Sequence, residues 1–458
     1  MSETVVTLKK GEGRTIKAGG AWIYDNEVDT IVGHFKNGDI CIVHDFDGYP
    51  MGRGFINQNS KIRIRMLTRK KDQEINYEFI YARVKAAWDY RKSVMQNANP
   101  DSVAGIGTTD ISDLNCTRII FGEADFLPGL VVDKYDDVLV VECLALGMDR
   151  LKRSVLSCLL RLLELDGISI TAVYERSDAA VRKKEGLQVF KGILPIRWIR
   201  ALDEDNFGED IADFSDYESV STQISEAEKN RVNNPIEIVE NGVHYLVDVI
   251  NGQKTGFFLD QKYNRYAIQK IAANLSKNGE SIRVLDCFTH MGTFALNCGL
   301  GGAVDVLGLD ISDFAVSQAS ENARLNGLSD RVKFKQANVL DELPKLAEQG
   351  EKYDLLILDP PAFTKSREAT KNAIKGYREI NMKGLKLVKD GGYFATCSCS
   401  HFMTQELLEE VVKQAAKATH KRLRQIEFRT QACDHPILWA ATESYYLKFL
   451  IFQVVEEK

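Results

Sequence analysis

Residues 283–294 read RVLDCFTHMGTF, an apolar run that ends in aspartate, followed by a short loop and a glycine that opens a further apolar stretch. Two later runs follow the same plan, VDVLGLDIS at 304–312 and YDLLILDPPAF at 353–363. Runs such as LLIL are apolar without alternation, as expected of strands buried on both faces of a parallel sheet. Helical patterns separate these runs, so residues 236–458 are predicted to form a doubly wound α/β domain.

Polar or small residues stand where each predicted strand ends, and ligands of such sheets bind at that edge. The first loop runs from Asp286 to Gly292, and its glycine allows the backbone to approach a ligand closely. It lacks the G-x-G-x-x-G pattern, which disfavours a nicotinamide cofactor. Asp310 stands where a carboxylate binds ribose hydroxyls. Asn338 could offer an amide to an adenine edge. Each residue alone is equally compatible with a cap or turn, but the series favours a ligand site.

Two further strand ends carry residues suited to chemistry. The sequence DPPAF at 359–363 places Asp359 before two prolines, which fix φ and lack amide donors, so a rigid loop is predicted. The sequence ATCSCS at 395–400 places Cys397 and Cys399 beside serines at the same edge. Buried filler is the alternative interpretation of a cysteine there, but the position favours a nucleophile.

A thiolate beside a carboxylate suggests one reaction in particular. Carbon 5 of a pyrimidine attacks a methyl sulfonium only after a thiolate has added to carbon 6 and made the ring enamine-like. Asp359 would hydrogen-bond the cytosine N4 amine or, if protonated, N3. A base must then remove the carbon 5 proton, and no residue for that step is evident in the sequence.

The N-terminal third is organised differently. Short apolar runs broken by glycine predict a small β domain over residues 1–74, and a mixture of strands and helices predicts an α+β domain over 75–195. In SKIRIRML, Lys61, Arg63 and Arg65 alternate with apolar residues, so a strand would place the three cations on one face. That face is predicted either to contact RNA phosphates or simply to be solvated.

An acidic block explains the overall charge. The formal net charge of the 458 residues is −6, but the segment from Asp203 to Glu228 contains ten acidic residues and no lysine or arginine. Without this block the charge would be +4, so the acidic pI argues only weakly against an RNA partner. Its low hydrophobicity and lack of period predict an acidic insert or linker over 196–235.

The remaining composition limits the compartment and the cofactors. Nine cysteines without zinc-ligand spacing favour reduced thiols, and no metal site is predicted. The N-terminus does not resemble a signal peptide, and no stretch is apolar enough to span a membrane, so a cytoplasmic protein without membrane contact is expected. The sequence does not indicate an oligomeric state.

These motifs together resemble class I S-adenosylmethionine-dependent RNA methyltransferases, and more closely the ribosomal large subunit methyltransferase I family of cytosine-5 enzymes. Further segments of the resemblance are GAWIYDNEV at 20–28, GQKTGFFLDQKYNR at 252–265, GYREINMKGL at 376–385 and QACDHPI at 431–437. The resemblance implies a PUA domain for RNA binding, a central β-rich domain, a Rossmann-like catalytic domain, S-adenosylmethionine as cofactor and large-subunit ribosomal RNA as partner.

The resemblance also implies roles for individual residues. It makes Cys397 the nucleophile, with Asp359 and Cys399 as the other catalytic residues. Asn338 stands where relatives usually have aspartate, and Ala362 where many other RNA cytosine-5 enzymes have a second cysteine. The cofactor-binding residues would be Thr255, Phe257, Phe258, Asp260, Gln261, Arg265, Asp286, Cys287, Phe288, Thr289, Gly292, Asp310, Ile311, Asn338, Val339, Asp359 and Pro360.

Two other functions fit part of the pattern. Asp-Pro-Pro followed by an aromatic residue also serves enzymes that methylate exocyclic amines, although that leaves Cys397 without a role; carbon 5 of uracil is a further acceptor. A non-catalytic RNA-binding assembly factor could keep the fold and the pocket. The suitable residues at each strand end favour a catalyst.

Overall fold

The computed structural model describes residues 3–98, 114–202, 215–277, 279, 281–364 and 369–456. The chain divides into two compact units, each built from segments that are far apart in sequence. Unit 1 comprises Met1–Ile238, Val247–Leu259 and Cys433–Ser444. Unit 2 comprises Val239–Leu246, Asp260–Ala432 and Tyr445–Lys458.

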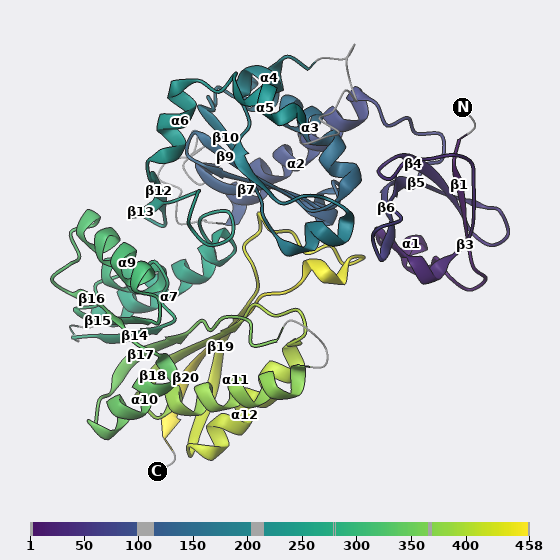
Figure 1. Ribbon diagram of the computed structural model, residues 1–458. Coiled ribbons are helices and arrows are strands. Elements are labelled where there is room, and N and C mark those ends of the chain that lie inside the picture. The colour runs from purple at the N-terminus through teal and green to yellow at the C-terminus, as the bar shows by residue number, and fades with distance from the viewer. Residues whose placement is uncertain are drawn as a thin grey trace. The chain divides into compact units, whose positions relative to one another are not determined.

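Unit 1 begins with a small β domain, as the glycine-broken apolar runs predict. Its six-stranded sheet has the order β2-β6-β5-β4-β1-β3 and a core that includes Val6, Ile23, Val43 and Ile64 (Figure 1). The elements are β1 (Val5–Leu8), α1 (Arg14–Lys17), β2 (Trp22–Tyr24), β3 (Val28–Val32), β4 (Ile40–His44), β5 (Pro50–Ile56) and β6 (Ile62–Thr68).

The second part of unit 1 is the predicted α+β region. A five-stranded mixed sheet of order β11-β10-β9-β8-β7 packs with two long helices, and the helix that begins at Tyr77 buries Ile80, Val84 and Trp88. The elements are α2 (Tyr77–Ala98), β7 (Cys116–Phe121), β8 (Leu130–Tyr135), β9 (Val138–Cys143), α3 (Leu146–Leu165), β10 (Ala172–Ser177), β11 (Phe190–Ile193) and α4 (Ile196–Arg200).

The acidic block is only partly visible in the structure. Its residues 203–214 lie outside the described residues. The remainder contains helices α5 (Ser215–Ser221) and α6 (Glu226–Asn233), which the interpretation as a linker did not predict. Ser225 and Glu228 form a reciprocal capping box at α6, and the Glu228 carboxylate also accepts a hydrogen bond from the Ile196 amide at 2.8 Å. Glu228, one of the ten acidic residues, therefore forms structural hydrogen bonds rather than remaining a solvated charge.

Unit 2 contains the predicted doubly wound sheet, of order β16-β15-β14-β17-β18-β20-β19. The first five strands in this order are parallel, while β20 is antiparallel to both β18 and β19. The strands are β14 (Arg283–Cys287), β15 (Asp305–Asp310), β16 (Val332–Gln336), β17 (Tyr353–Leu358), β18 (Val388–Ser398), β19 (Lys421–Arg429) and β20 (Lys448–Glu456). The strand order reverses between β14 and β17, which makes their carboxyl ends the expected ligand site.

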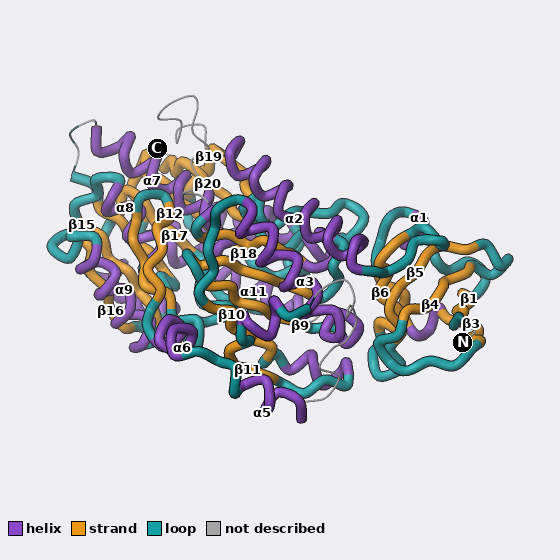
Figure 2. Tube along the Cα trace, turned by 90° about the horizontal axis from the view of Figure 1, so that it is seen from above, coloured by secondary structure: helices purple, strands orange, loops and turns teal. Residues whose placement is uncertain are grey.

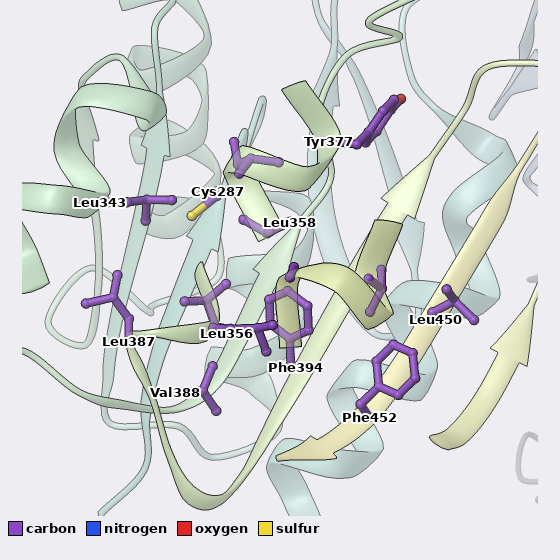
Figure 3. Close-up of a cluster of buried hydrophobic side chains, with 14 of the residues drawn as sticks. Cys287, Leu343, Leu356, Leu358, Tyr377, Leu387, Val388, Phe394, Leu450 and Phe452 are labelled. Atoms are coloured by element: carbon purple, nitrogen blue, oxygen red, sulfur yellow. The ribbon is translucent and has the colours of Figure 1, made fainter. Parts of the chain in front are cut away.

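Helices pack beside the strands in unit 2 (Figure 2). They are α7 (Lys262–Lys277), α8 (Thr293–Leu300), α9 (Asp313–Leu325), α10 (Val339–Glu348), α11 (Thr370–Leu385) and α12 (Gln405–Ala418). Figure 3 shows the core under α10, α11 and α12, where Leu356, Leu358 and Phe394 meet Leu343 and Tyr377. A two-stranded hairpin of β12 (Ile236–Glu240) and β13 (Val243–Val247) precedes α7.

Candidate active site

The sheet register brings Asp359 and Cys397 together. Strand β17 pairs with β14 on one side and with β18 on the other, and Leu358 is opposite both Cys287 and Thr396. Asp359 and Cys397 are the next residues along their strands, so they emerge side by side. Gln261 links them, because its Nε2 lies 3.0 Å from Asp359 Oδ2 and 3.3 Å from Cys397 Sγ.

Both groups have unusual proton affinities. Burial raises the pKa of Asp359 to about 6, against hydrogen bonds from Cys397 and Gln261 that lower it. Burial, with the charge of Asp359, raises the pKa of the Cys397 thiol well above its usual range. The resting thiol is therefore protonated and hydrogen-bonded to a carboxyl that titrates near neutrality. Such a pair can exchange a proton when a substrate arrives.

The segment before α7 is fixed to the C-terminal part of unit 2. Asn264, one helical turn beyond Gln261, donates to Gln261 Oε1 at 2.6 Å, and Arg429 Nε donates to Asn264 at 3.1 Å. The neighbouring Asp260 accepts a hydrogen bond at Oδ2 from Tyr446 Oη at 2.7 Å. Gln261 therefore contacts Asp359 and Cys397, while Asp260 contacts Tyr446, and the cofactor contact expected of both residues stays a prediction.

The end of β18 is held by buried polar contacts. Ser398 Oγ donates to Tyr377 Oη at 3.0 Å, and Ser400 Oγ donates to the Thr364 carbonyl at 2.9 Å. Lys448 donates to the carbonyls of Ser400 at 2.6 Å and Tyr446 at 2.8 Å, and burial lowers its pKa to about 8. Cys399 lies in this turn and is partly exposed. The turn is thus rigid enough to present a thiol at a defined place.

The loop after β14 forms the second part of the site. Asp286 is fully buried, and its Oδ2 accepts hydrogen bonds from Thr289 Oγ1 at 2.5 Å and from the Ala295 amide at 3.0 Å. Its Oδ1 is buried without a hydrogen-bond partner among the described residues. Burial raises the pKa of Asp286 to about 7. Gly292 has φ +81°, and an added Cβ would lie 2.6 Å from Phe334 Cζ, so this turn requires glycine.

Asp310 ends β15 as predicted and organises the neighbouring loops. Its two carboxylate oxygens accept hydrogen bonds from the amides of His290 at 3.0 Å and Ser312 at 2.9 Å. Ile311 beside it is 67% exposed. Asn338 is exposed and caps α10 by accepting from the Leu340 amide at 3.1 Å. The cap explains Asn338 locally and occupies its side-chain oxygen.

Other predicted cofactor residues have structural contacts. The side chains of Cys287 and Val339 lie in the hydrophobic core, so only their backbone could face a ligand, and Pro360 is also buried. Arg265 forms a buried bidentate ion pair with Glu240, at 2.6 and 2.9 Å. Phe288 packs against the core.

The segment before residue 260 belongs to unit 1. Thr255 Oγ1 donates to Asp133 at 2.5 Å and lies 2.9 Å from Tyr135 Oη. Phe257 is buried and Phe258 is partly buried. The cofactor role expected of these three residues stays a prediction.

The three N-terminal cations differ in exposure, so only part of the expected cationic face is accessible, and their contact with RNA stays a prediction. Arg65 is buried, and its guanidinium lies 3.1 Å from both Glu123 and Glu185. Lys61 is exposed, and Arg63 is partly exposed with one contact to the Asn57 carbonyl. Arg65 lies on β6, between β2 and β5. Its guanidinium is covered by Glu123 and Glu185, carboxylates from the second part of unit 1. Only Lys61 and Arg63 remain candidates for phosphate contact.

Several residues that contact the candidate site were not identified from the sequence. Asn264 lies three residues after Gln261, a spacing that places neighbouring side chains together when the segment is helical. Tyr446 and Lys448 gave no local signal, since they act on residues 186 and 48 positions away.

Comparison with known proteins places the chain in a family. A model of the PUA-like domain matches residues 6–69, and a model of S-adenosylmethionine-dependent methyltransferases matches residues 223–436. A ribosomal RNA large subunit methyltransferase I from Alteromonas mediterranea is 32% identical over 99% of both chains. The chain belongs to the ribosomal RNA large subunit methyltransferase I family. A second member, from Aeromonas salmonicida, is 33% identical over 97% of this chain and 98% of its own.

These matches confirm the PUA-like and Rossmann-like fold class and S-adenosylmethionine as the family's cofactor. Solved structures share the fold. A candidate S-adenosylmethionine-dependent methyltransferase from Streptococcus mutans has a TM-score of 0.71, with 15% identity over 98% of this chain and 99% of that one. A second, solved in complex with SAH, has a TM-score of 0.73, with 15% identity over 99% of this chain and all of that one.

Within the described ranges, no cluster of three or more His, Cys, Asp or Glu side chains is arranged to hold a metal ion. In the same part of the chain, no helix is long and apolar enough to cross a membrane.

Proposed function

We propose that this protein transfers a methyl group from S-adenosylmethionine to carbon 5 of a cytosine in large-subunit ribosomal RNA, through a covalent adduct at Cys397. The observation that carries the proposal is the group formed by Gln261, Asp359 and Cys397 at the ends of β17 and β18. A thiol held beside a carboxyl that titrates near neutrality suits addition to a pyrimidine ring. Transfer to an exocyclic amine requires no thiol.

The chain's own residues would act on the base in a defined order. Asp359 accepts the thiol proton and passes it to N3 of the cytosine, while the Cys397 sulfur bonds to carbon 6. Gln261 fixes the carboxyl relative to the sulfur. Bound S-adenosylmethionine supplies the methyl group that carbon 5 then accepts. The final loss of the carbon 5 proton restores the aromatic ring and releases the thiol.

The cofactor fits the loops at the ends of β14 and β15. The unpartnered, buried Oδ1 of Asp286 suits an ammonium donor such as that of the methionine moiety. The carboxylate of Asp310 stands where ribose hydroxyls could replace its present amide donors. Backbone from Cys287 to Gly292, together with Ile311, Asn338 and Val339, would surround the remaining cofactor atoms.

The partner assignment rests on the family and on the PUA-like domain. The relatives named above are ribosomal RNA large subunit methyltransferases, and they match this chain along almost its whole length. Lys61 and Arg63 on the PUA-like domain supply cations suited to phosphates.

Large-subunit RNA transcribed with 5-fluorocytidine tests the mechanism. Fluorine cannot leave as a proton does, so wild-type protein with S-adenosylmethionine is expected to form an adduct that survives denaturing electrophoresis. Cys397→Ser should abolish the adduct and reduce methyl transfer by roughly 10³-fold or more, with cofactor affinity retained. Cys399→Ser is the matched control and should lose much less.

The same experiment separates the alternatives. Near-normal methyl transfer by Cys397→Ser would remove the covalent mechanism and favour an exocyclic amine. An adduct mapped to Cys399 would keep the reaction but reassign the nucleophile. An adduct formed with 5-fluorouridine RNA but not with 5-fluorocytidine RNA would make uracil the target.

A further inference from the structure

Asp260 has an oxygen that the fold leaves unused. Its Oδ2 accepts the hydrogen bond from Tyr446, whereas its Oδ1 is buried without a hydrogen-bond partner among the described residues. The Asp260 carbonyl accepts a hydrogen bond from the Ala432 amide at 2.8 Å, which fixes the backbone as well. A carboxylate oxygen held in place but unpaired is costly, which indicates a role with a ligand.

Asp260 lies next to the residue that links the two proposed catalytic groups. It directly precedes Gln261, whose amide contacts both Asp359 and Cys397. Its charge also acts on Asp359, since it is among the groups that raise the pKa of that carboxyl. Asp260 therefore adjoins the residue that links Asp359 and Cys397, and its charge acts on Asp359.

Other titratable groups near Asp359 and Cys397 are less suited to accept a proton from carbon 5. Tyr377 accepts the hydrogen bond from Ser398, and burial raises its pKa above the usual range, so its hydroxyl keeps its proton. Lys448 donates to two backbone carbonyls. Asp359 is occupied with the ring edge in the proposed reaction. Cys399, close to the nucleophile, is the remaining rival.

We propose that Asp260 is the catalytic base that removes the proton from carbon 5, an assignment that rests on the proposed cytosine-5 reaction. After methyl transfer, carbon 5 carries both the methyl group and the proton, and carbon 6 carries the Cys397 sulfur. The Asp260 carboxylate takes the proton, the carbon–hydrogen electron pair becomes the 5,6 double bond, and the carbon–sulfur bond breaks. The N3 proton returns to the leaving thiolate through Asp359, and Asp260 releases its proton to water.

Asp260→Asn removes the base but keeps the size of the side chain. We expect this variant to add Cys397 to ordinary, unfluorinated RNA and to accept the methyl group, but to release product roughly 100-fold more slowly or worse. With S-adenosylmethionine labelled in the methyl group, a labelled protein–RNA adduct should therefore accumulate on denaturing gels. Cofactor affinity, measured by calorimetry, should change less than about threefold. Asp330→Asn, which alters an exposed carboxylate, should behave as wild type.

Each other outcome overturns the assignment. Normal release of methylated RNA by Asp260→Asn would exclude it as the base, and loss of cofactor affinity would make it a cofactor ligand. Accumulation of the labelled adduct in Cys399→Ser, but not in Asp260→Asn, would make Cys399 the base. If Asp260→Asn does not fold, Tyr446→Phe should accumulate the same adduct to a smaller degree, and a folded Tyr446→Phe without it would contradict the proposal. Failure of the cytosine-5 reaction itself is distinct, because wild type would then form no adduct with 5-fluorocytidine RNA.

Discussion

Buried carboxylates in the two units have different partners. In unit 1 several carboxylates are paired with cations: the buried Asp125 with Arg91 and Asp133 with Arg118, and the partly buried Asp149 with Lys152 and Arg182. Burial alone would raise the pKa of Asp149, but the two cations outweigh it and lower the pKa. At the strand ends of unit 2, Asp286 and Asp359 accept only neutral donors, and their pKa values rise to about 7 and 6.

The difference separates carboxylates that stabilise the fold from those that await a ligand. Unit 2 can also pair a buried charge, as Arg265 and Glu240 show away from the strand ends. The strand-end carboxylates therefore lack cations because of their position rather than the composition of the unit. A site without lysine or arginine partners suits a cationic cofactor, since sulfonium and ammonium groups supply the missing charge.

The largest effect is expected where a paired carboxylate is removed. Asp125→Ala leaves Arg91 buried without its carboxylate and should lower the free energy of unfolding by about 3–5 kcal/mol. Denaturant unfolding followed by circular dichroism measures it. The control is Asp89→Ala on α2, the helix that carries Arg91. The ion pair of Asp89 with Lys85 is exposed and should contribute less than about 1 kcal/mol. Equal effects of the two substitutions would remove the distinction between paired and exposed carboxylates.

An intermediate effect is expected from the pH dependence of Asp286. Its folded pKa of about 7 lies above the usual aspartate value of 3.8, so between these pH values the folded protein binds more protons than the unfolded chain. The free energy of unfolding should therefore fall as pH rises from 4 to 7, by about 2–4 kcal/mol from this group. Asp359 adds a loss of the same sign up to about pH 6.

Asp286→Asn should remove its share of that slope, and S-adenosylmethionine should bind wild type more tightly as the carboxyl ionises. Unfolding curves and calorimetry at pH 5, 6 and 7 test both statements. Identical slopes for Asp286→Asn and wild type would show that Asp286 is not a neutral carboxyl in the fold.

The smallest effect is expected at the PUA-like domain, where a buried cation paired with carboxylates is compared with two more exposed cations. Lys61→Gln and Arg63→Gln should each reduce the slope of log affinity for RNA against log salt by about 0.7–0.9 if each residue contacts one phosphate. Arg65→Gln should leave this slope unchanged and lower thermal stability instead, because Arg65 is paired with two glutamates. Filter binding over a range of salt concentrations measures the slopes. An unchanged slope in Lys61→Gln and Arg63→Gln would assign that face to solvent.

Local sequence was sufficient for the sheet of unit 2 and for bringing the ends of its parallel strands to one edge. Unbroken apolar runs ending in Asp286, Asp310 and Asp359 predict parallel strands, and parallel strands place their carboxyl ends at one edge. The family resemblance then supplied the cofactor, and it implies the proposed role of Cys397. Both inferences use information confined to short segments, where hydrophobic period and turn residues determine the backbone.

Tertiary structure alone decided which charges are available. The alternation around Arg65 is that of a solvated strand face, yet Glu123 and Glu185 approach from 58 and 120 residues away and cover it. Tyr446 donates a hydrogen bond to Asp260 from 186 positions away. Glu228, which the sequence assigned to a linker, lies in helix α6 and accepts a hydrogen bond from the Ile196 amide. The sequence determines which side chains carry a charge. The solvation and the partner of each charge depend on the distant segments that pack against it. Solvation and partner together determine whether the charged side chain stabilises the fold or binds a ligand.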